Sequence, residues 1–267
     1  MIKKFKFIGS LLLASTILFT AAGCSKTKET STDTKSASRK IVVGMDDTFP
    51  PMEYRDEANN LKGFDIDLAN ELGKRLNIQF EFMPTDWNGV IQSLKSKRFD
   101  IILSALSITP EREQEIAFSR PYMAGGQIIV VKKDNKNINS REDLKGKVVG
   151  LQLGSTAEAA VKDIEGSIKQ VKKYDKNTEA LQDLAIGRLD AVVVDELVGR
   201  YYIKDKSAEF RILKEQLSKE DTGIGFRKED TQLRDEFNKA LEDMKNDGTL
   251  AKLSSKWLGE DITKKMR

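Results

Sequence analysis

Histidine is absent from this chain of 267 residues, and its absence excludes much enzyme chemistry. Without an imidazole there can be no Ser-His-Asp triad, no histidine general base and no histidine-ligated zinc. A Gly-rich phosphate-binding loop is missing as well, because Gly223-Ile224-Gly225 has neither the third glycine nor its spacing. Most common hydrolase mechanisms are excluded in this way, and we predict no catalytic residues, no metal and no cofactor.

Cysteine and long apolar runs are also scarce. Cys24 is the only cysteine, so an intramolecular disulfide is impossible. The apolar run from Phe7 to Phe19 spans about 13 residues, too few for the roughly 20 of a membrane-crossing helix. Three lysines precede this run and Ala21-Ala22-Gly23 follows it. This order is typical of a secretory signal over residues 1–23, with an uncleaved anchor as the alternative.

The thiol of Cys24, directly after Ala21-Ala22-Gly23, resembles the lipobox of bacterial lipoproteins. The resemblance implies cleavage before Cys24 and lipidation of its sulfur, for example with palmitate, which would anchor the chain outside the cytoplasm on the cell membrane. An ordinary secretory cleavage is the alternative. Removal of the signal takes away three lysines and with them the formal net charge of +3. A neutral mature chain argues against nucleic acid as a partner.

A Ser- and Thr-rich segment follows the cysteine. These two residue types make up 8 of the 14 residues from Ser25 to Ser38, without apolar periodicity. This composition is typical of a flexible tether, which we place at residues 24–40. The folded body begins at Ile41, and its length suits one large domain or two small ones.

Strand and helix patterns alternate along this body. Ile66, Ala69 and Leu72 follow the spacing of one helix face, whereas Ile78, Phe80 and Phe82 alternate as in a strand. A helix near 90–94 and a strand at 101–103 follow. The same alternation of strand and helix patterns is repeated from Lys147 onward, with strands at 148–151, 168–171 and 191–194 and helices at 156–162 and 178–186. The alternation predicts two units, each with a parallel α/β sheet.

The remaining segments connect and close these units. Two glycines open the extended segment 125–131, which we expect to carry the chain from one unit to the next. Residues 222–226 predict a returning strand, and helices are expected from Asp230 to Lys245 and from Thr249 to Trp257. The spacing of Trp257 in the last helix indicates a packing role.

The most specific ordered blocks of the sequence are Asp46 to Tyr54, Gly63 to Leu68 and Asp100 to Ser119. Together these blocks resemble the family 3 solute-binding proteins of polar amino-acid ABC importers. The resemblance implies the type II periplasmic-binding-protein fold, an α/β fold of two doubly wound lobes joined by a two-strand hinge. Residues 41–124 and 222–267 would form lobe 1, and residues 127–218 lobe 2. It also implies a monomer that binds an L-amino acid between the lobes and passes it to permease subunits.

An amino-acid zwitterion needs a fixed cation for its carboxylate and a fixed anion for its ammonium, and Arg112 and Asp195 are the candidates. Thr109 as N-cap and Pro110 as first helical residue place Arg112 in the first helical turn, where a guanidinium can hold a carboxylate bidentately. The alternative for Arg112 is a surface pair with Glu115. Asp195 ends an apolar strand, where ligands bind in open α/β sheets, although it could also cap the following helix.

The resemblance implies further ligand contacts from two loops. In the first, Ser104, Ala105 and Ser107 would offer carbonyls to the ammonium and a hydroxyl to the carboxylate. In the second, Ser155 and Thr156 precede a helix whose first amides point at an anion. A plain helix cap is the alternative for this second loop.

The resemblance places Asp46, Phe49, Glu53, Trp87 and Gln152 at the side-chain end of the pocket. These residues offer two carboxylates, two ring faces and an amide, without a lysine or arginine. They therefore predict a cationic ligand, arginine or lysine first, with glutamine or cystine next. Phe49 or Trp87 could instead belong to the core, and Glu53 could point to solvent.

Two rival functions stay open at this point. Cyclohexadienyl dehydratases resemble the same family and need only a well-placed carboxylic acid such as Glu53 or Glu196. A receptor's sensor domain would need a transmembrane exit after the C-terminal segment of lobe 1. The complete amino-acid site and the lipid tether favour a binding protein over both.

Overall fold

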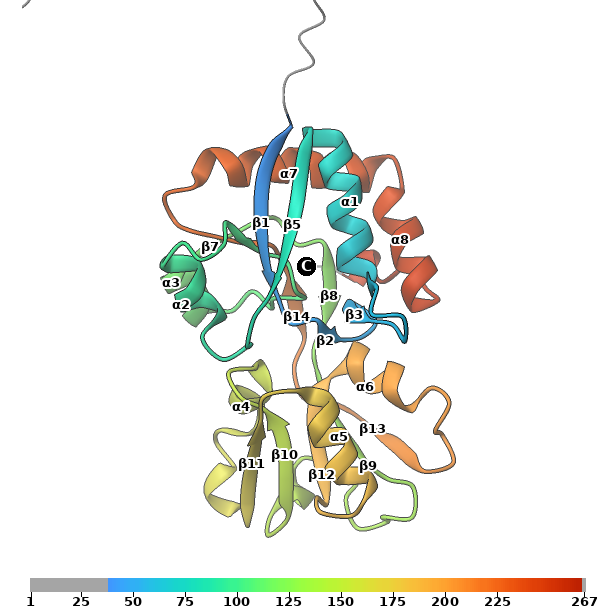
Figure 1. The fold of residues 1–267 in the computed structure, drawn as a ribbon. Helices are drawn as coiled ribbons and strands as arrows, with labels where there is room; N and C mark the ends of the chain where they lie inside the picture. The colour runs from blue at the N-terminus through green and yellow to red at the C-terminus, as the bar shows by residue number, and fades with distance from the viewer. Residues whose placement is uncertain (1–37, 266–267) are drawn as a thin grey trace, which may run out of the picture. The chain divides into compact units, whose positions relative to one another are not determined.

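Two five-stranded sheets organise residues 38–265, the part of the chain that the structure, a computed structural model, describes (Figure 1). The predicted signal, Cys24 and nearly all of the predicted tether lie outside these residues. The sheet that contains β1, with its helices, is called lobe 1 below, and the sheet that contains β10 is called lobe 2. No helix within residues 38–265 is long and apolar enough to cross a membrane.

Lobe 1 has a mixed sheet in the order β5-β1-β6-β15-β7. Strand β1 (Arg39–Met45) pairs in parallel with β5 (Ile78–Pro84) and β6 (Ile101–Ile102). Strand β15 (Gly225–Phe226) runs antiparallel between β6 and β7 (Ala117–Phe118). The helices of this lobe are α1 (Phe64–Leu76), α2 (Val90–Lys95), α3 (Pro110–Glu115), α7 (Thr231–Asn246) and α8 (Thr249–Leu258). The end of the chain therefore returns to the first lobe.

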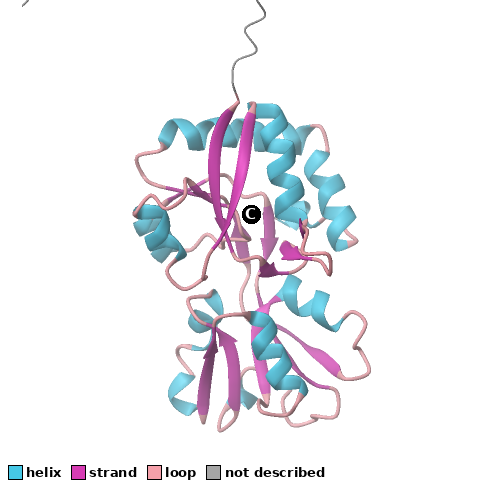
Figure 2. Ribbon diagram, viewed as in Figure 1, coloured by secondary structure: helices cyan, strands magenta, loops and turns pink. Residues whose placement is uncertain are grey.

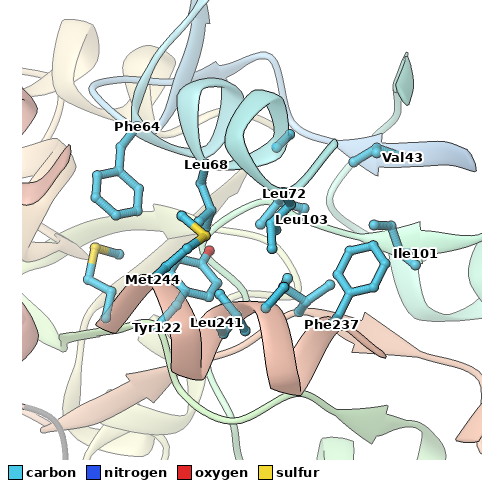
Figure 3. Close-up of a cluster of buried hydrophobic side chains, with 14 of the residues drawn as sticks. Val43, Phe64, Leu68, Leu72, Ile101, Leu103, Tyr122, Phe237, Leu241 and Met244 are labelled. Atoms are coloured by element: carbon cyan, nitrogen blue, oxygen red, sulfur yellow. The ribbon is translucent and has the colours of Figure 1, made fainter. Parts of the chain in front are cut away.

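The core of lobe 1 lies among α1, α7 and the sheet (Figure 3). Leu68 and Leu72 of α1 belong to one buried cluster with Phe237 and Leu241 of α7, and each is at most 2% exposed. Both pairs are four residues apart, so the helical period brings them to one face. Truncation of a side chain such as Phe237 to alanine would cost about 3–5 kcal/mol of folding free energy.

Lobe 2 has a sheet in the order β11-β10-β12-β9-β13. Strands β11 (Gln170–Tyr174), β10 (Val148–Gln152) and β12 (Ala191–Asp195) are parallel, whereas β9 (Gln127–Lys132) and β13 (Phe210–Gln216) complete the sheet in antiparallel pairs. The helices are α4 (Thr156–Val161), α5 (Asn177–Ala185) and α6 (Glu196–Ile203), with 3-10 turns at Glu142–Leu144 and Glu165–Ser167. Separate apolar clusters cover the two faces, which explains the continuous apolar runs of β9 and β12.

The chain crosses between the lobes twice, through two paired strands. Strand β8 (Met123–Gly125) leads into β9, and β14 (Glu220–Thr222) leads back from β13, with Glu220 opposite Gly125. These two are called the connecting strands below. Gly126, between β8 and β9, has φ of 154°, and a Cβ there would lie 2.0 Å from the carbonyl oxygen of Ser218. Only glycine fits at this crossing.

The sequence predicted most elements to within one or two residues but was wrong on three points. The sheets are mixed rather than parallel, because β9, β13 and β15 run antiparallel. The strand expected at 168–171 is β11, at Gln170–Tyr174, an edge strand whose exposed Lys173 hides it from an apolar pattern. The segment 125–131 is more than a connection, because β9 is a buried inner strand of lobe 2.

A small third sheet lies beside the first lobe's main sheet and leads into the candidate site. It consists of β2 (Thr48–Phe49), β3 (Glu53–Arg55) and β4 (Leu61–Lys62), and Figure 2 distinguishes these short strands from their loops. Trp257 of α8 meets the ring of Tyr54 edge to face and donates a hydrogen bond from Nε1 to Asp67 at 2.7 Å. The packing role predicted for Trp257 is confirmed, and a last 3-10 turn spans Ile262–Lys265.

Candidate functional site

A narrow cavity of about 20 Å³, called the interlobe cavity below, lies where the strand ends of the two lobes meet. This is the position at which open α/β sheets bind ligands. Nine residues proposed from the sequence line it, namely Phe49, Trp87, Ala105, Ser107, Arg112, Gln152, Ser155, Thr156 and Asp195. Asp46, Glu53 and Ser104 are not among the lining residues, and Gln127 and Asn177 are lining residues that the sequence did not suggest.

Arg112 brings the positive charge of the cavity. Thr109 accepts a hydrogen bond from the backbone N–H of Arg112, so Thr109 is the N-cap and Pro110 opens the helix as predicted. The guanidinium donates from Nη1 to the carbonyl of Ser107 at 3.0 Å and from Nη2 to the carbonyl of Gly154, in the other lobe, at 3.2 Å. Burial lowers the pKa of Arg112 to about 10, so the group stays protonated at neutral pH.

The surface pairing of Arg112 with Glu115 is wrong, because Glu115 pairs with Lys95 instead. Within residues 38–265 no carboxylate forms an ion pair with the Arg112 guanidinium. Its two hydrogen-bond acceptors among the described residues, Ser107 and Gly154, are neutral backbone carbonyls. The charges of Glu220 and Glu111 favour the charged guanidinium, but neither carboxylate pairs with it directly, so a bound anion would complete the buried cation.

Asp195 brings the negative charge from lobe 2. It follows the buried strand residues Ala191 to Val194, and its Oδ1 accepts a hydrogen bond from the backbone N–H of Leu197 at 2.8 Å. The helix-cap role is therefore present together with the position on the cavity. Burial, with the nearby charges of Glu220 and Glu196, raises the pKa of Asp195 to about 7. A cation in the cavity would favour the ionised carboxylate.

The loop after β6 holds the floor of the cavity in an unusual conformation. Ala105 has φ of 42°, in the left-handed region that a non-glycine residue rarely adopts. Its backbone N–H donates to Asp65 Oδ2 at 2.7 Å, which holds the strained residue in place. Ser107 forms an isolated β-bridge with Thr222 of the connecting strand β14. Ala105 and Ser107 line the cavity, whereas the Ser104 side chain points inward.

Glu53 lies neither in solvent nor on the cavity lining. It is 0% exposed inside lobe 1, where its Oε1 accepts a hydrogen bond from the Ser104 hydroxyl at 2.5 Å. Its neighbour is the equally buried Asp65, and burial raises the pKa of both carboxyls, that of Asp65 to about 6. The negative charge of Asp65 adds to burial in raising the pKa of Glu53. The reading of Glu53 as a solvent-exposed residue is wrong.

Asp46 and Gln152 meet across the lobes at the other end of the cavity. The Asp46 carboxylate accepts hydrogen bonds from the N–H and hydroxyl of Thr48, and from Gln152 Nε2 at 2.8 Å. Gln152 Oε1 in turn accepts from Asn177 at 2.8 Å. Burial raises the pKa of Asp46, although these hydrogen bonds oppose the shift. Asn177 opens α5 and showed no signal in the sequence beyond its place after a strand.

The two predicted ring residues have different surroundings. Phe49 is half-buried and packs against the apolar clusters of both lobes, so its core and cavity roles coexist. The Arg112 guanidinium carbon lies 5.6 Å from the centre of the Trp87 ring. Trp87 also lines an adjacent hollow of about 160 Å³, in which Asp46, Asp47, Asp86 and Asp175 outnumber the single cation Lys176. Trp87 therefore borders both the interlobe cavity and an acidic hollow.

Ser155 and Thr156 enter the cavity at the start of α4. The Ser155 hydroxyl accepts a hydrogen bond from the N–H of Ala157 and donates to the carbonyl of Gln152, so it caps the helix. Thr156 donates from its hydroxyl to Glu220 at 2.8 Å and accepts from Gln127 at 3.0 Å. Gln127 follows the glycine pair that was expected to connect the lobes. Gln127 could have been identified from this place at the start of the strand that pairs with the strand ending at Asp195.

A larger groove of about 710 Å³ lies beside the connecting strands, α6 and α8. It contains none of the residues that were proposed for the site. Its charged side chains include internally paired groups, such as Arg200 with Glu196 and Lys265 with Glu260. The smaller interlobe cavity, where Arg112 and Asp195 form no ion pair with any residue that the structure describes, is therefore the candidate site.

Comparisons with known proteins agree with this architecture. The family model for bacterial extracellular solute-binding proteins, family 3, matches residues 41–260. The L-cystine-binding protein TcyJ of Escherichia coli (strain K12) is 36% identical over 226 residues, which cover 84% of each chain. The arginine-binding extracellular protein ArtP of Bacillus subtilis (strain 168) is 37% identical over 251 residues, 92% of this chain and 96% of ArtP.

Solved structures show the same likeness in three dimensions. An ancestral arginine-binding protein bound to glutamine is 47% identical and has a TM-score of 0.79, with coverage of 83% of this chain and 98% of that protein. The predicted type II periplasmic-binding-protein fold is thus confirmed. The matched relatives are binding proteins rather than enzymes. This chain belongs to the bacterial extracellular solute-binding proteins of family 3.

Proposed function

We propose that this protein is the extracytoplasmic amino-acid-binding component of an ABC importer, and that its ligand is a cationic L-amino acid, arginine or lysine. The observation that carries the amino-acid part is one cavity lined by a cation and an anion, Arg112 and Asp195. Neither forms an ion pair within residues 38–265. A zwitterion supplies an anion to the first and a cation to the second, and each charged hydrogen bond is then completed.

The acidic hollow beside Trp87 supports a cationic side chain. Asp46 joins the interlobe cavity to this hollow through Gln152, and Trp87 lines both spaces. A guanidinium or ammonium that extends over the Trp87 ring would gain cation–π attraction and meet carboxylates beyond it. A glutamate side chain would meet the same carboxylates and be repelled. With Glu53 inside lobe 1, the cationic preference rests on Asp46 and the acidic hollow.

Glutamine and cystine are the next candidates. The Gln152 amide and the Asp46 carboxylate can pair with an uncharged polar side chain as well. Relatives of this chain include an arginine-binding protein, a cystine-binding protein and an ancestral arginine-binding protein bound to glutamine. This range agrees with the set of ligands that the chemistry of the cavity favours.

The deciding measurement is calorimetric titration of the mature protein with arginine, lysine, glutamine, cystine and glutamate in one buffer, after a thermal-shift screen of the 20 common amino acids. We expect arginine or lysine to bind most tightly and glutamate not to bind measurably. Tightest binding of glutamate would refute the charge argument. Absence of binding for every amino acid would refute the proposed function itself.

The proposal includes a lipid anchor at Cys24 and permease subunits as partners. A tethered receptor would close over its ligand by motion about the connecting strands β8 and β14. Cation and anion come from opposite lobes, so a zwitterion would stabilise the closed arrangement. The permease would then recognise the closed form.

A further inference from the structure

Gln127 occupies a position beside the anionic end of the interlobe cavity. It is the first residue of β9, and the register of the sheet places it directly opposite Asp195 of β12. Opposed residues of antiparallel strands project to the same face, with Cβ atoms about 4.5–5.5 Å apart. Gln127 is 3% exposed and lines the cavity together with Asp195. A group bound by Asp195 would therefore lie within reach of the Gln127 amide.

A ring of four hydrogen bonds holds Gln127 in place. Its backbone N–H donates to the Ser218 hydroxyl at 2.9 Å, and its side-chain Nε2 donates to the Thr156 hydroxyl at 3.0 Å. The Ser218 hydroxyl donates to Glu220 Oε1 at 2.5 Å, and the Thr156 hydroxyl donates to Glu220 Oε2 at 2.8 Å. Glu220 belongs to the connecting strand β14, so the ring joins the cavity to the crossing between the lobes.

The direction of these bonds determines how the Gln127 amide is oriented. A carboxylate only accepts hydrogen bonds, so Glu220 takes the single proton of each hydroxyl. The Thr156 oxygen can then only accept, and the amide group that faces it must be the NH₂ group. The amide oxygen Oε1 is consequently turned away from Thr156. This oxygen is buried and has no hydrogen-bond partner among the residues that the structure describes.

We infer that Gln127 is a further ligand-binding residue, whose Oε1 accepts a hydrogen bond from the ammonium of the bound amino acid beside Asp195. Glu220 is the positioning residue that presents this oxygen, through Thr156 and Ser218. This inference rests on the proposed amino-acid-binding function. A primary ammonium has three N–H donors, and Asp195 Oδ1 is already engaged by the N–H of Leu197. Asp195 Oδ2, Gln127 Oε1 and the carbonyl that Ala105 would offer from the opposite lobe then take one N–H each, so the site should select primary amines over N-methylated ones.

The test pairs a change in the protein with a change in the ligand. Wild-type protein and the variant Gln127→Met are titrated calorimetrically with L-arginine and with Nα-methyl-L-arginine, in which a methyl group replaces one N–H donor. We expect the wild type to prefer arginine by at least about tenfold. Gln127→Met should bind arginine about tenfold more weakly and lose most of that preference, because the acceptor that distinguishes the two ligands is gone.

Two further variants separate ligand contact from a structural effect. Gln216→Met is the matched control, because Gln216 also lies beside the connecting strands but does not line the interlobe cavity, and its preference should equal that of the wild type. Glu220→Gln should reduce the preference by less than Gln127→Met, because the amide persists and only its orientation is freed. If Gln127→Met does not fold, Gln127→Asn takes its place in the test, because its side chain is one methylene group shorter and its amide oxygen lies farther from the ligand.

The outcomes distinguish this inference from the proposed function. If another amino acid of the panel binds the wild type more tightly, that amino acid and its Nα-methyl derivative replace the arginine pair. The inference alone is overturned if the wild type binds an amino acid tightly and the Gln127 variant keeps the wild-type affinity and the wild-type preference for the primary amine to within about twofold. Wild-type protein that binds no amino acid overturns the proposed function.

Discussion

Asp46 of lobe 1 accepts a hydrogen bond from Gln152 of lobe 2 at 2.8 Å, although the two residues are 106 positions apart in the sequence. Arg112 makes a second contact of this kind with the carbonyl of Gly154, at 3.2 Å. The lining of the interlobe cavity itself also comes from both lobes, with Arg112 from lobe 1 and Asp195 from lobe 2. A ligand that binds both residues contacts the two lobes together, which is the condition for ligand-dependent closure.

The charge of Asp46 is expected to determine the preference for a cationic ligand. Asp46→Asn keeps an oxygen for the Thr48 hydrogen bonds but removes the negative charge. We expect arginine to bind about tenfold more weakly, since a hydrogen bond to a charged group contributes about 1.5–3 kcal/mol, while glutamine binding changes little. Calorimetry with both ligands measures the ratio. An equal loss for arginine and glutamine would show that Asp46 supports the cavity without selecting charge.

Arg112 is expected to be the dominant anchor of the ligand carboxylate. Removal of one partner of a buried charge pair typically costs about 2–5 kcal/mol, so Arg112→Ala should weaken binding by roughly 30-fold or more. Arg120→Ala is the matched control, because Arg120 is an exposed arginine of the same lobe that pairs with Glu242. Calorimetric affinities of the two variants should differ widely. Unchanged affinity of Arg112→Ala would dismiss the site.

Ligand binding is expected to weaken as the pH falls below about 7. Burial raises the pKa of Asp195 to about 7, and the ionised form is the one that pairs with an ammonium. Below this pKa binding must release a proton, and affinity should fall by about tenfold per pH unit. Titrations between pH 5.5 and 8 check this, and Asp195→Asn should bind weakly at every pH. A wild-type affinity that stays constant over this range contradicts the role of Asp195.

The buried pair Glu53 and Asp65 is expected to make the protein less stable as the pH rises above about 4. Burial raises the pKa of Glu53, and that of Asp65 to about 6, so between about pH 4 and these values the folded state binds more protons than the unfolded state. The free energy of unfolding then decreases with rising pH. Asp195 adds to the same trend. Below about pH 4 stability should fall again, since acids such as Asp247, with its pKa lowered to about 2, lose their hydrogen bonds.

The variant Asp65→Asn isolates the contribution of this pair. The variant removes the Asp65 carboxyl and, with it, the nearby charge that raises the pKa of Glu53. The decrease in Tm between pH 5 and pH 8 should therefore be smaller than in the wild type. Glu57→Gln serves as the control, because Glu57 is an exposed acid of the same lobe. Thermal unfolding of the three proteins at both pH values gives the comparison. An identical decrease in all three would mean that this pair does not cause the loss of stability.

Cys24→Ser tests the lipid anchor. Wild-type protein expressed with its own leader is expected in the membrane fraction and labelled by palmitate, whereas the variant should be released and unlabelled. The variant should keep its ligand affinity, because the folded body is unchanged. A variant that stays with the membrane would show that something other than the Cys24 thiol anchors the chain.

The amino-acid sequence by itself determined the alternation of strands and helices and much of the candidate site. The spacing of Leu68 and Leu72 with their apolar neighbours predicts α1, and Thr109-Pro110 predicts the start of α3 with Arg112 in its first turn. These features are local, because caps, helical periodicity and strand ends depend on residues a few positions apart. Resemblance to a family then supplied candidate residues that spacing alone could not.

Only the tertiary structure decided which of these candidates meet. The sequence could not tell that Glu53 turns inward to Asp65, because a loop residue followed by a short strand has two faces to choose from. Nor could it identify Gln127, whose role depends on its register with Asp195 and on hydrogen bonds to Thr156 and Ser218. Antiparallel pairing and the contact between lobes join residues from 29 to 106 positions apart. Such partners are selected by packing and hydrogen-bond satisfaction throughout the folded body, and no local pattern records them.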